Sequence, residues 1–117
     1  MEGSDHLLEA ISALTDTAEH LGDVLSRYQQ ANREFAERLS NRETVLDAID
    51  SFVVGTMRRP RELTEALEEF EAARHKVRLT MIALAVSQGT TMSELGRRLD
   101  LSRQLMSRLA AEAAKTE

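Results

Sequence analysis

Four polar residues near the C-terminus, Arg103, Gln104, Ser107 and Arg108, have types and spacing suited to binding a surface rich in hydrogen-bond acceptors. Intervals of one, three and one residue bring them to one side of a helix, which turns once in about 3.6 residues. An arginine can donate to both acceptors of guanine, and a glutamine can form two hydrogen bonds with adenine. The group predicts recognition of polar edges rather than catalysis.

Two short helices are expected to position these residues. Thr91 and Glu94 fit a capping box, which predicts a helix beginning at Met92. Asp100 and Ser102 frame a three-residue turn, and Ser102 is a good cap for a helix beginning at Arg103. Two helices joined by so short a turn must cross steeply.

The apolar residues of this segment fit the inner face of such a crossing, and Gly96 supplies a small residue where the second helix would otherwise collide with a side chain. The segment at residues 90–109 carries five of these apolar residues: Leu95, Leu99, Leu101, Met106 and Leu109. This pattern resembles the helix-turn-helix superfamily of bacterial DNA-binding proteins. It is most similar to the sigma-factor and the winged or tri-helical repressor versions, in which a Ser-Arg pair opens the recognition helix. Many members carry glycine at the position of Asp100, but aspartate tolerates the left-handed conformation.

The resemblance implies double-stranded DNA as the partner. It implies base contacts by the N-terminal part of the recognition helix, at Arg103, Gln104, Ser107 and Arg108. It implies phosphate contacts by Thr91, Arg97, Arg98 and Ser102, with weaker candidates in Arg74, Lys76 and Arg78. Leu105 is open between packing and contact with a thymine methyl group.

The segment from about Asp5 to Leu39 predicts a long amphipathic helix. Apolar residues, with the polar Asn32 at one position, recur at alternating intervals of four and three, a heptad pattern that buries one seam against another helix: Leu7, Ile11, Leu14, Ala18, Leu21, Leu25, Tyr28, Asn32, Phe35 and Leu39. We expect dimerisation through Ile11, Leu14, Leu21, Leu25, Tyr28, Asn32 and Phe35. The alternative is that the helix folds back on its own chain, with Asn32 at the edge of that face.

The middle of the chain predicts two further helices. Ser40 and Glu43 fit a capping box for a helix reaching about Val54, stopped by Gly55, that buries Val45, Leu46, Ile49, Phe52 and Val53. The alternative is one continuous helix, which places Arg42 on the seam. Residues 57–60 look like a connector, with Pro60 in the first turn of a helix that ends at the left-handed cap Gly89. That helix carries Leu63, Leu67, Phe70, Ala73, Val77, Met81 and Leu84 at intervals of three and four.

The charge is divided unevenly along the chain. Residues 1–56 hold eleven acidic residues and four arginines, a net charge of −7, although the whole chain carries only −5. Residues 74–108 hold seven basic and two acidic residues, a net charge of +5. A basic segment of this kind favours a nucleic-acid partner, because phosphate neutralisation supplies most of the non-specific affinity.

Several classes of function lack the residues they need. The chain has no cysteine, which excludes disulfides and thiolate metal sites. His6, His20 and His75 have no ligand-like spacing and are expected on the surface, and the glutamates at 62–71 are expected to form a solvated face. No phosphate loop, catalytic triad or cofactor motif is present, so we expect neither an enzyme nor a cofactor. No apolar run spans a membrane and no signal peptide begins the chain, so a cytoplasmic, nucleoid-associated location is expected.

The sequence thus predicts an all-α chain with a helical dimerisation region at 1–57 and a helix-turn-helix domain at 58–117. The predicted function is sequence-specific, homodimeric control of transcription. One alternative is an adaptor that uses the motif as a scaffold, with a protein partner on the acidic N-terminal helices. Another is an accessory factor that binds DNA without sequence choice.

Overall fold

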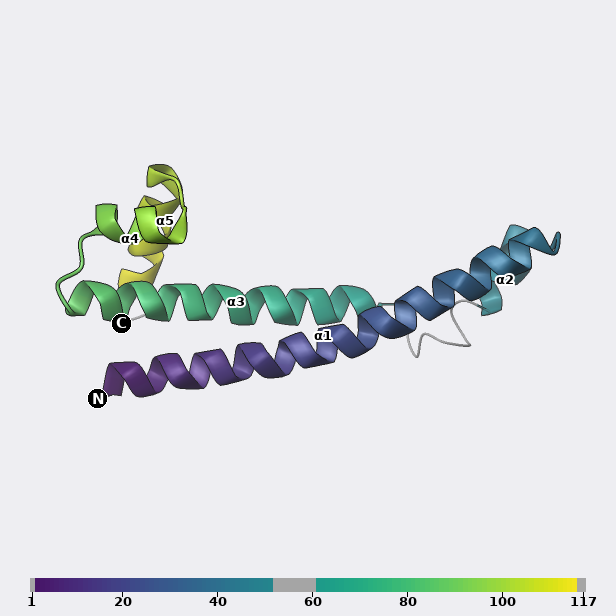
Figure 1. Cartoon of the computed structure of the whole chain (residues 1–117), viewed down its shortest axis with the longest axis horizontal. Helices are drawn as coiled ribbons and strands as arrows, with labels where there is room; N and C mark the ends of the chain where they lie inside the picture. The colour runs from purple at the N-terminus through teal and green to yellow at the C-terminus, as the bar shows by residue number, and fades with distance from the viewer. Residues whose placement is uncertain (1, 52–60, 116–117) are drawn as a thin grey trace. The chain divides into compact units, whose positions relative to one another are not determined.

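A computed structural model describes residues 2–51 and 61–115 of the chain, and these residues form helices joined by short turns (Figure 1). The helices are α1 (Glu2–Ser40), α2 (Val45–Ser51), α3 (Glu62–Ser87), α4 (Met92–Leu99) and α5 (Arg103–Lys115). No strand occurs in this described part, so the all-α prediction is confirmed. None of these helices combines the length and the apolar character that a membrane span requires.

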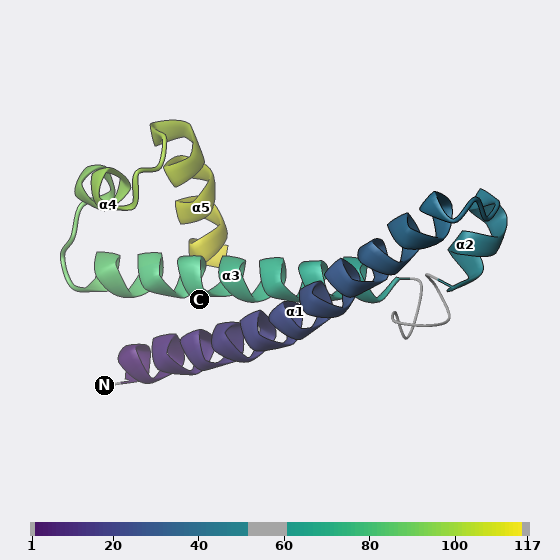
Figure 2. The same cartoon turned by 45° about the vertical axis from the view of Figure 1, so that its right-hand side comes forward.

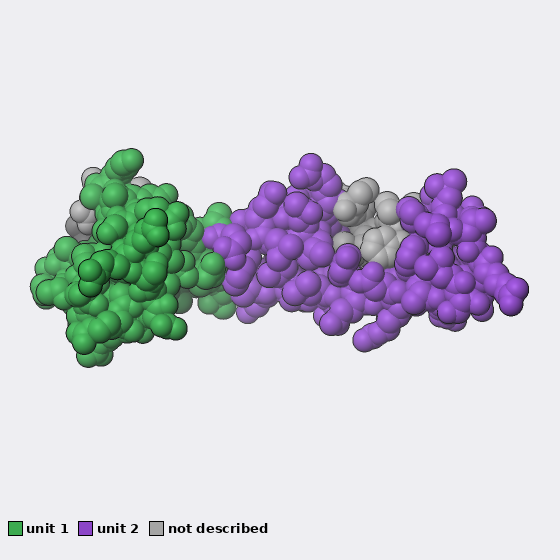
Figure 3. Space-filling model, turned by 90° about the horizontal axis from the view of Figure 1, so that it is seen from above, with its two compact units in different colours: residues 1–15, 72–117 green, residues 16–71 purple. Residues whose placement is uncertain are grey.

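The chain divides into two compact units, coloured separately in Figure 3. Unit 1 comprises residues 1–15 and 72–117, and unit 2 comprises residues 16–71. In each unit a stretch of α1 runs alongside a stretch of α3. The predicted domain boundary at residue 57 lies outside the described residues and stays a prediction.

The core of unit 2 joins α1 to the first turns of α3. Val24 and Ala31 are fully buried, Ala66 is 1% exposed, and Leu21, Tyr28 and Leu63 pack around them. The alternative in which the helix folds back on its own chain therefore holds for this part of α1. Small side chains at the contact let the two helix backbones approach closely, which larger residues would prevent.

A buried ion pair crosses the same contact. Glu62 is only 5% exposed, and its Oε1 lies 2.5 Å from Nη2 of Arg27. The hydrogen bond that Arg27 donates to Glu62 raises the pKa of Arg27 above its ordinary value, so the arginine stays charged. The prediction that the glutamates at 62–71 form a solvated face is therefore wrong for Glu62, because the fold brings a cation to it. Glu68, Glu69 and Glu71 are exposed as predicted.

The buried row of α1 differs from the predicted seam. The most buried positions are Ala10, Val24 and Ala31, which follow one another at multiples of seven, one residue before seam positions. Of the predicted seam, Leu21 and Tyr28 are half-buried in the core of unit 2, whereas Leu25 remains 41% exposed. On α3, Leu67 of the predicted apolar row is likewise 43% exposed, because Ala66 beside it faces α1.

A break separates α1 from α2, so the continuous-helix alternative is wrong. Arg42 adopts the left-handed conformation with a φ of 66°, and its N–H donates to the carbonyl oxygen of Leu39 at 3.1 Å. The N–H of Glu43 donates to the carbonyl oxygen of Arg38, also at 3.1 Å, which completes a Schellman cap. A positive φ costs a non-glycine residue free energy, so the cap compensates for strain at Arg42.

The capping role expected of Ser40 is wrong. Ser40 is the last residue of α1, and its hydroxyl donates to the carbonyl oxygen of Ala36 at 3.0 Å. Thr44 caps α2 instead, accepting the N–H of Asp47 at 3.2 Å. The left-handed turn at Arg42 delays the new helix by four residues, which moves the capping position to Thr44.

The expected burial of the α2 side chains is also wrong. Ala48 is fully buried, whereas Val45, Leu46 and Ile49 are 58%, 71% and 40% exposed. The inward face of this seven-residue helix is the one that carries the alanine. The expectations for Phe52, Val53, Val54, Gly55 and residues 57–60 lie outside the described residues.

In unit 1, α3 supports the two C-terminal helices, and α3 ends as predicted. Gly89 has a φ of 93°, and its N–H donates to the carbonyl oxygen of Val86. The N–H of Thr90 reaches back to the carbonyl oxygen of Ala85 at 3.0 Å, which forms a second Schellman cap. The chain can therefore leave α3 sharply and enter α4 (Figure 1).

Candidate nucleic-acid interface

The α4–α5 pair begins with the cap that the sequence predicts. Thr91 is extended, with φ −77° and ψ 152°, and its hydroxyl accepts the N–H of Glu94 at 3.2 Å. The carboxylate of Glu94 does not complete the capping box, because it binds Arg97 and Arg98 instead. The predicted start of α4 is thus confirmed. The predicted role of the Glu94 side chain in the capping box is wrong.

The turn between the two helices contains three residues, as predicted. Asp100 is left-handed, with φ 55° and ψ 45°, and the N–H of Leu101 donates to the carbonyl oxygen of Gly96 at 2.9 Å. Ser102 caps α5 by accepting the N–H of Leu105 at 3.1 Å. With both ends fixed, the helices cross steeply, and α4 is seen almost end-on where α5 lies nearly in the plane of the view (Figure 2).

A single apolar cluster holds α3, α4 and α5 together. Its buried members are Ile82, Leu95, Met106, Leu109 and Ala113, and Leu99, Leu101 and Leu105 pack against them. Leu105 therefore packs against the cluster while part of its side chain stays exposed. A single continuous core fixes the orientation of α5 on α3.

Gly96 lies where the two helices meet. A Cβ atom at this buried position would lie 3.0 Å from Cγ of Met106 and 3.6 Å from the carbonyl oxygen of Leu101. The predicted need for a small residue is confirmed. Met106 is only 3% exposed, so it has little room to yield.

The four predicted base-contacting residues form one exposed ridge, named here the α5 ridge: Arg103, Gln104, Ser107 and Arg108. At about 100° per residue they occupy a sector of roughly 140°, opposite the side that buries Met106, Leu109 and Ala113. Within residues 2–51 and 61–115, Arg103 and Arg108 take part in no ion pair. Toward this described part of the chain, both guanidinium groups thus keep their donors for another molecule.

The α4 arginines are exposed but already paired. The side chains of Arg97 and Arg98 are 75% and 78% exposed, and both contact the carboxylate of Glu94, which Arg98 Nε reaches at 2.8 Å. Surface ion pairs of this kind contribute about 0–1 kcal/mol, so a phosphate can replace the carboxylate. The i, i+3 and i, i+4 spacing of Glu94 from the two arginines is a sequence signal for these pairs that the predicted capping box overlooked.

The hydroxyl groups assigned to phosphate contacts are also exposed. Thr91 and Ser102 both accept an N–H from their own helix, which leaves each O–H free to donate. The three weaker candidates on α3 are separated by the structure. Arg74 and Arg78 line a groove of about 200 Å³ with Leu99 and Leu101 of the α4–α5 pair, whereas Lys76 lines another groove.

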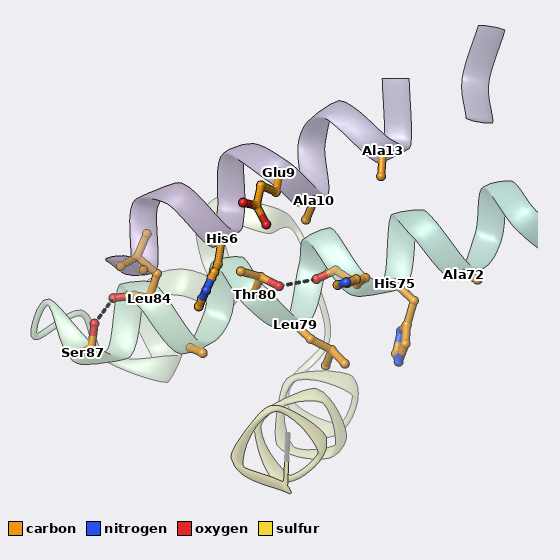
Figure 4. Close-up of a pocket in the computed structure, with 13 residues that line it drawn as sticks. His6, Glu9, Ala10, Ala13, Ala72, His75, Leu79, Thr80, Leu84 and Ser87 are labelled. Carbon is orange, nitrogen blue, oxygen red and sulfur yellow. Dashed lines mark hydrogen bonds between the residues drawn. The ribbon is translucent and has the colours of Figure 1, made fainter. Parts of the chain in front are cut away.

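That other groove lies between the N-terminal part of α1 and α3 (Figure 4). It has a volume of about 640 Å³ and a mostly small-residue lining that includes Ala10, Ala13 and Ala83. The Thr80 hydroxyl in this groove donates to the carbonyl oxygen of Lys76 at 2.8 Å, so its proton is used within α3. No group of three or more metal-ligating side chains occurs among the described residues, in this groove or elsewhere.

His75 ties α3 to the last turns of α5. Its Nε2 lies 2.8 Å from Oε2 of Glu112, with both side chains about half exposed. His6 and His20 are exposed, as expected. His75 also reaches the surface, but α5 brings a carboxylate to it, which the sequence did not predict. No local sequence signal points to this contact, since the two residues are 37 positions apart.

The structure thus brings together an exposed basic ridge, a paired basic group beside it and a common apolar support. Their residues come from one continuous stretch of sequence, and the support comes from α3. Comparison of the chain with protein-family models, with curated proteins and with solved structures finds no match.

Proposed function

We propose that this protein is a sequence-specific regulator of transcription that binds double-stranded DNA as a homodimer, with α5 as the recognition helix of a helix-turn-helix. The observation that carries the proposal is the α5 ridge. Its four polar side chains are exposed on the N-terminal half of the second helix of a steeply crossed pair. A helix presented in this way fits the major groove of B-DNA, where each base pair offers a distinct pattern of donors and acceptors.

The ridge residues have separate roles in this proposal. Arg103, at the first turn of α5, donates to guanine, and Gln104 beside it bonds adenine. Ser107 and Arg108 follow one turn later and read the next bases or the adjacent phosphate. Arg97 and Arg98 exchange Glu94 for phosphates of the backbone, which sets the register of α5 in the groove.

The dimer follows from the small footprint of one α5 ridge. A single recognition helix contacts only a few base pairs, so useful specificity requires two copies. A symmetric pair would read a two-part site whose halves lie about one helical turn, roughly 34–36 Å, apart. Of the predicted dimerisation residues on α1, Ile11, Leu25 and Asn32 are exposed and can meet a second copy, whereas Leu21 and Tyr28 already pack in the core of unit 2.

The decisive experiment is selection of bound sequences from a random duplex pool, repeated with R103A/R108A. We expect a two-fold symmetric consensus for the unmodified chain. For the double variant we expect a loss of affinity of about a hundredfold, since each good base contact discriminates by about 1–3 kcal/mol. R61A is the matched control, because Arg61 is an exposed arginine just before α3 and belongs neither to the α5 ridge nor to the helix-turn-helix.

Enrichment of no consensus, with equal affinity for all duplexes and a steep loss with salt, would instead identify a non-specific DNA-binding factor. Unchanged duplex binding by R103A/R108A would show that the recognition helix is wrongly assigned.

A further inference from the structure

Helix α1 keeps an exposed strip without charge, although another of its faces packs on α3. Within unit 2 this α1 strip consists of two adjacent rows with a spacing of seven, namely Ala18, Leu25, Asn32 and Leu39, and Gly22, Gln29 and Ala36. All seven residues are exposed, Leu25 to 41% and Leu39 to 38%. Strips of this spacing are typical of helices that pack along their length, and α3 already occupies the different row of Val24 and Ala31.

The row that flanks the α1 strip has a symmetric charge pattern. Glu19 and Arg33 lie seven residues before and seven residues after Ser26, and all three side chains are exposed. Neither Glu19 nor Arg33 forms an ion pair with any residue that the structure describes. If a second copy of this row runs in the opposite direction and is centred on Ser26, its Arg33 lies at the level of Glu19 and its Glu19 at the level of Arg33. Two antiparallel copies of the row therefore have complementary charges.

Two copies of one helix can use such a row in only one orientation. When they pack antiparallel about a twofold axis, each flanking row lies beside the same row of the other copy, running in the opposite direction. An axis at Ser26 then sets Glu19 of each copy against Arg33 of the other. When the helices are parallel, this row lies on opposite sides of the pair and the charges cannot meet.

We infer that the α1 strip binds the same strip of a second copy of this chain, antiparallel, with the twofold axis near Ser26. Leu25 packs near Leu25 of the second copy at the centre, and two Glu19–Arg33 pairs close one edge. On the other edge, the half-buried Leu21 lies opposite Tyr28 of the second copy, so the core of unit 2 is extended across the axis. Asn32 then lies opposite Ala18 rather than a second Asn32.

The partner is a second copy because the surface is complementary to itself. A different protein would need neither the equal spacing of the two charges about Ser26 nor their opposite signs. The inference deepens the dimeric part of the proposed function, which requires two copies. It does not depend on DNA binding, and its tests contain no DNA, so the two proposals fail separately.

Charge exchange tests the orientation. Sedimentation equilibrium of E19R and of R33E should show a dimer dissociation constant raised about tenfold, because each change replaces two attractions by two repulsions. The double variant E19R/R33E should restore dimerisation, since the charges are again opposite. E68R is the matched control, because Glu68 is exposed on α3 and belongs neither to the strip nor to its flanking row, and it should dimerise as the unmodified chain does.

Cross-linking gives a second, independent readout, because the chain has no cysteine of its own. S26C should form a disulfide-linked dimer under mild oxidation, since Ser26 lies on the proposed axis, whereas N32C should not. A linked N32C with an unlinked S26C would overturn the antiparallel arrangement in favour of a parallel one. A chain that stays monomeric at all concentrations, or a double charge variant that folds but fails to dimerise, would overturn the interface itself.

Discussion

At the scale of single residues, the carboxylate of Glu94 determines how much positive charge α4 offers. It contacts both Arg97 and Arg98, so the two arginines assigned to phosphates are held by one acid of their own helix. A phosphate must displace this carboxylate before either arginine can neutralise it fully. Under the proposed function, Glu94 therefore lowers the affinity for DNA that the two arginines would otherwise provide.

Replacement of Glu94 by glutamine should strengthen duplex binding about three- to tenfold, because both guanidinium groups become available to phosphates. The unfolding free energy should fall by less than about 1 kcal/mol, since the lost pairs are exposed. Fluorescence anisotropy with a labelled duplex measures the first effect and thermal unfolding the second. E68Q makes the same chemical change at an exposed site on α3 and should alter neither; a weaker-binding E94Q would show that Glu94 positions the arginines productively.

Two glycines in helices allow a matched test of packing. G96V should destabilise the chain by about 1–3 kcal/mol, because added atoms collide with Met106, whose Cγ would lie 3.0 Å from even a Cβ atom. A Cβ atom at Gly22 meets no atom of its own chain within 4 Å, so at concentrations at which the chain is monomeric G22V should leave stability unchanged or raise it by about 0.5 kcal/mol through better helix propensity. Equal effects of the two substitutions on urea-induced unfolding would contradict the tight crossing at Gly96.

At the scale of helices, local signals were predictable and tertiary faces were not. Thr91, Ser102 and Gly89 were identified from sequence because a cap depends on residues within one turn of it. The predicted seam of α1 is displaced by one residue from the row that is buried. Ala10, Val24 and Ala31 are buried only because α3 lies on that side. Small residues give a weak hydrophobic signal, so the larger seam residues beside them dominated the pattern.

The residues of the candidate nucleic-acid interface also divide into those that local sequence predicts and those that depend on tertiary packing. The exposure of Arg103, Gln104, Ser107 and Arg108 could be predicted, because the positions of Met106 and Leu109 fix the opposite side of α5. The pairing of His75 with Glu112 could not, since it requires the packing of α5 on α3. The predicted capping role of Ser40 was wrong for a different reason. Ser40 fits a capping box, but the left-handed turn at Arg42 intervenes before α2 begins.

Alanine substitution distinguishes the two candidate caps between α1 and α2. T44A should destabilise unit 2 by about 1 kcal/mol, because it leaves the N–H of Asp47 without its acceptor. S40A should change stability by less than about 0.5 kcal/mol, since the Ser40 hydroxyl bonds only within its own helix. Thermal unfolding followed by circular dichroism compares the two, and a larger loss for S40A would restore the first interpretation of this turn.

At the scale of the whole molecule, the two units carry very different charge. Unit 1 holds eight basic and seven acidic residues, a net charge of +1, and unit 2 holds seven basic and thirteen acidic residues, a net charge of −6. The overall charge of −5 therefore conceals a unit that an acidic partner can approach. Acidic residues in unit 2 also oppose loose association with DNA outside the α5 ridge.

The salt dependence of binding should report which arginines contact phosphates. R97A/R98A should reduce the slope of log affinity against log salt by about two for each bound chain, since B-DNA contributes about 0.9 for each phosphate neutralised. The selected DNA consensus should stay the same, because these arginines set position rather than sequence. R103A should instead relax the consensus at one position, and a changed consensus in R97A/R98A would reverse these assignments.

The separation of packing residues from ridge residues on α5 has a consequence for how this protein can change. Met106, Leu109 and Ala113 bind the helix to its support, and none of them belongs to the ridge. Mutations at the four ridge positions should therefore accumulate at little cost to folding, so under the proposed function descendants of this chain can acquire new target sites while the scaffold is conserved. The same separation makes α5 a practical place to install a chosen specificity.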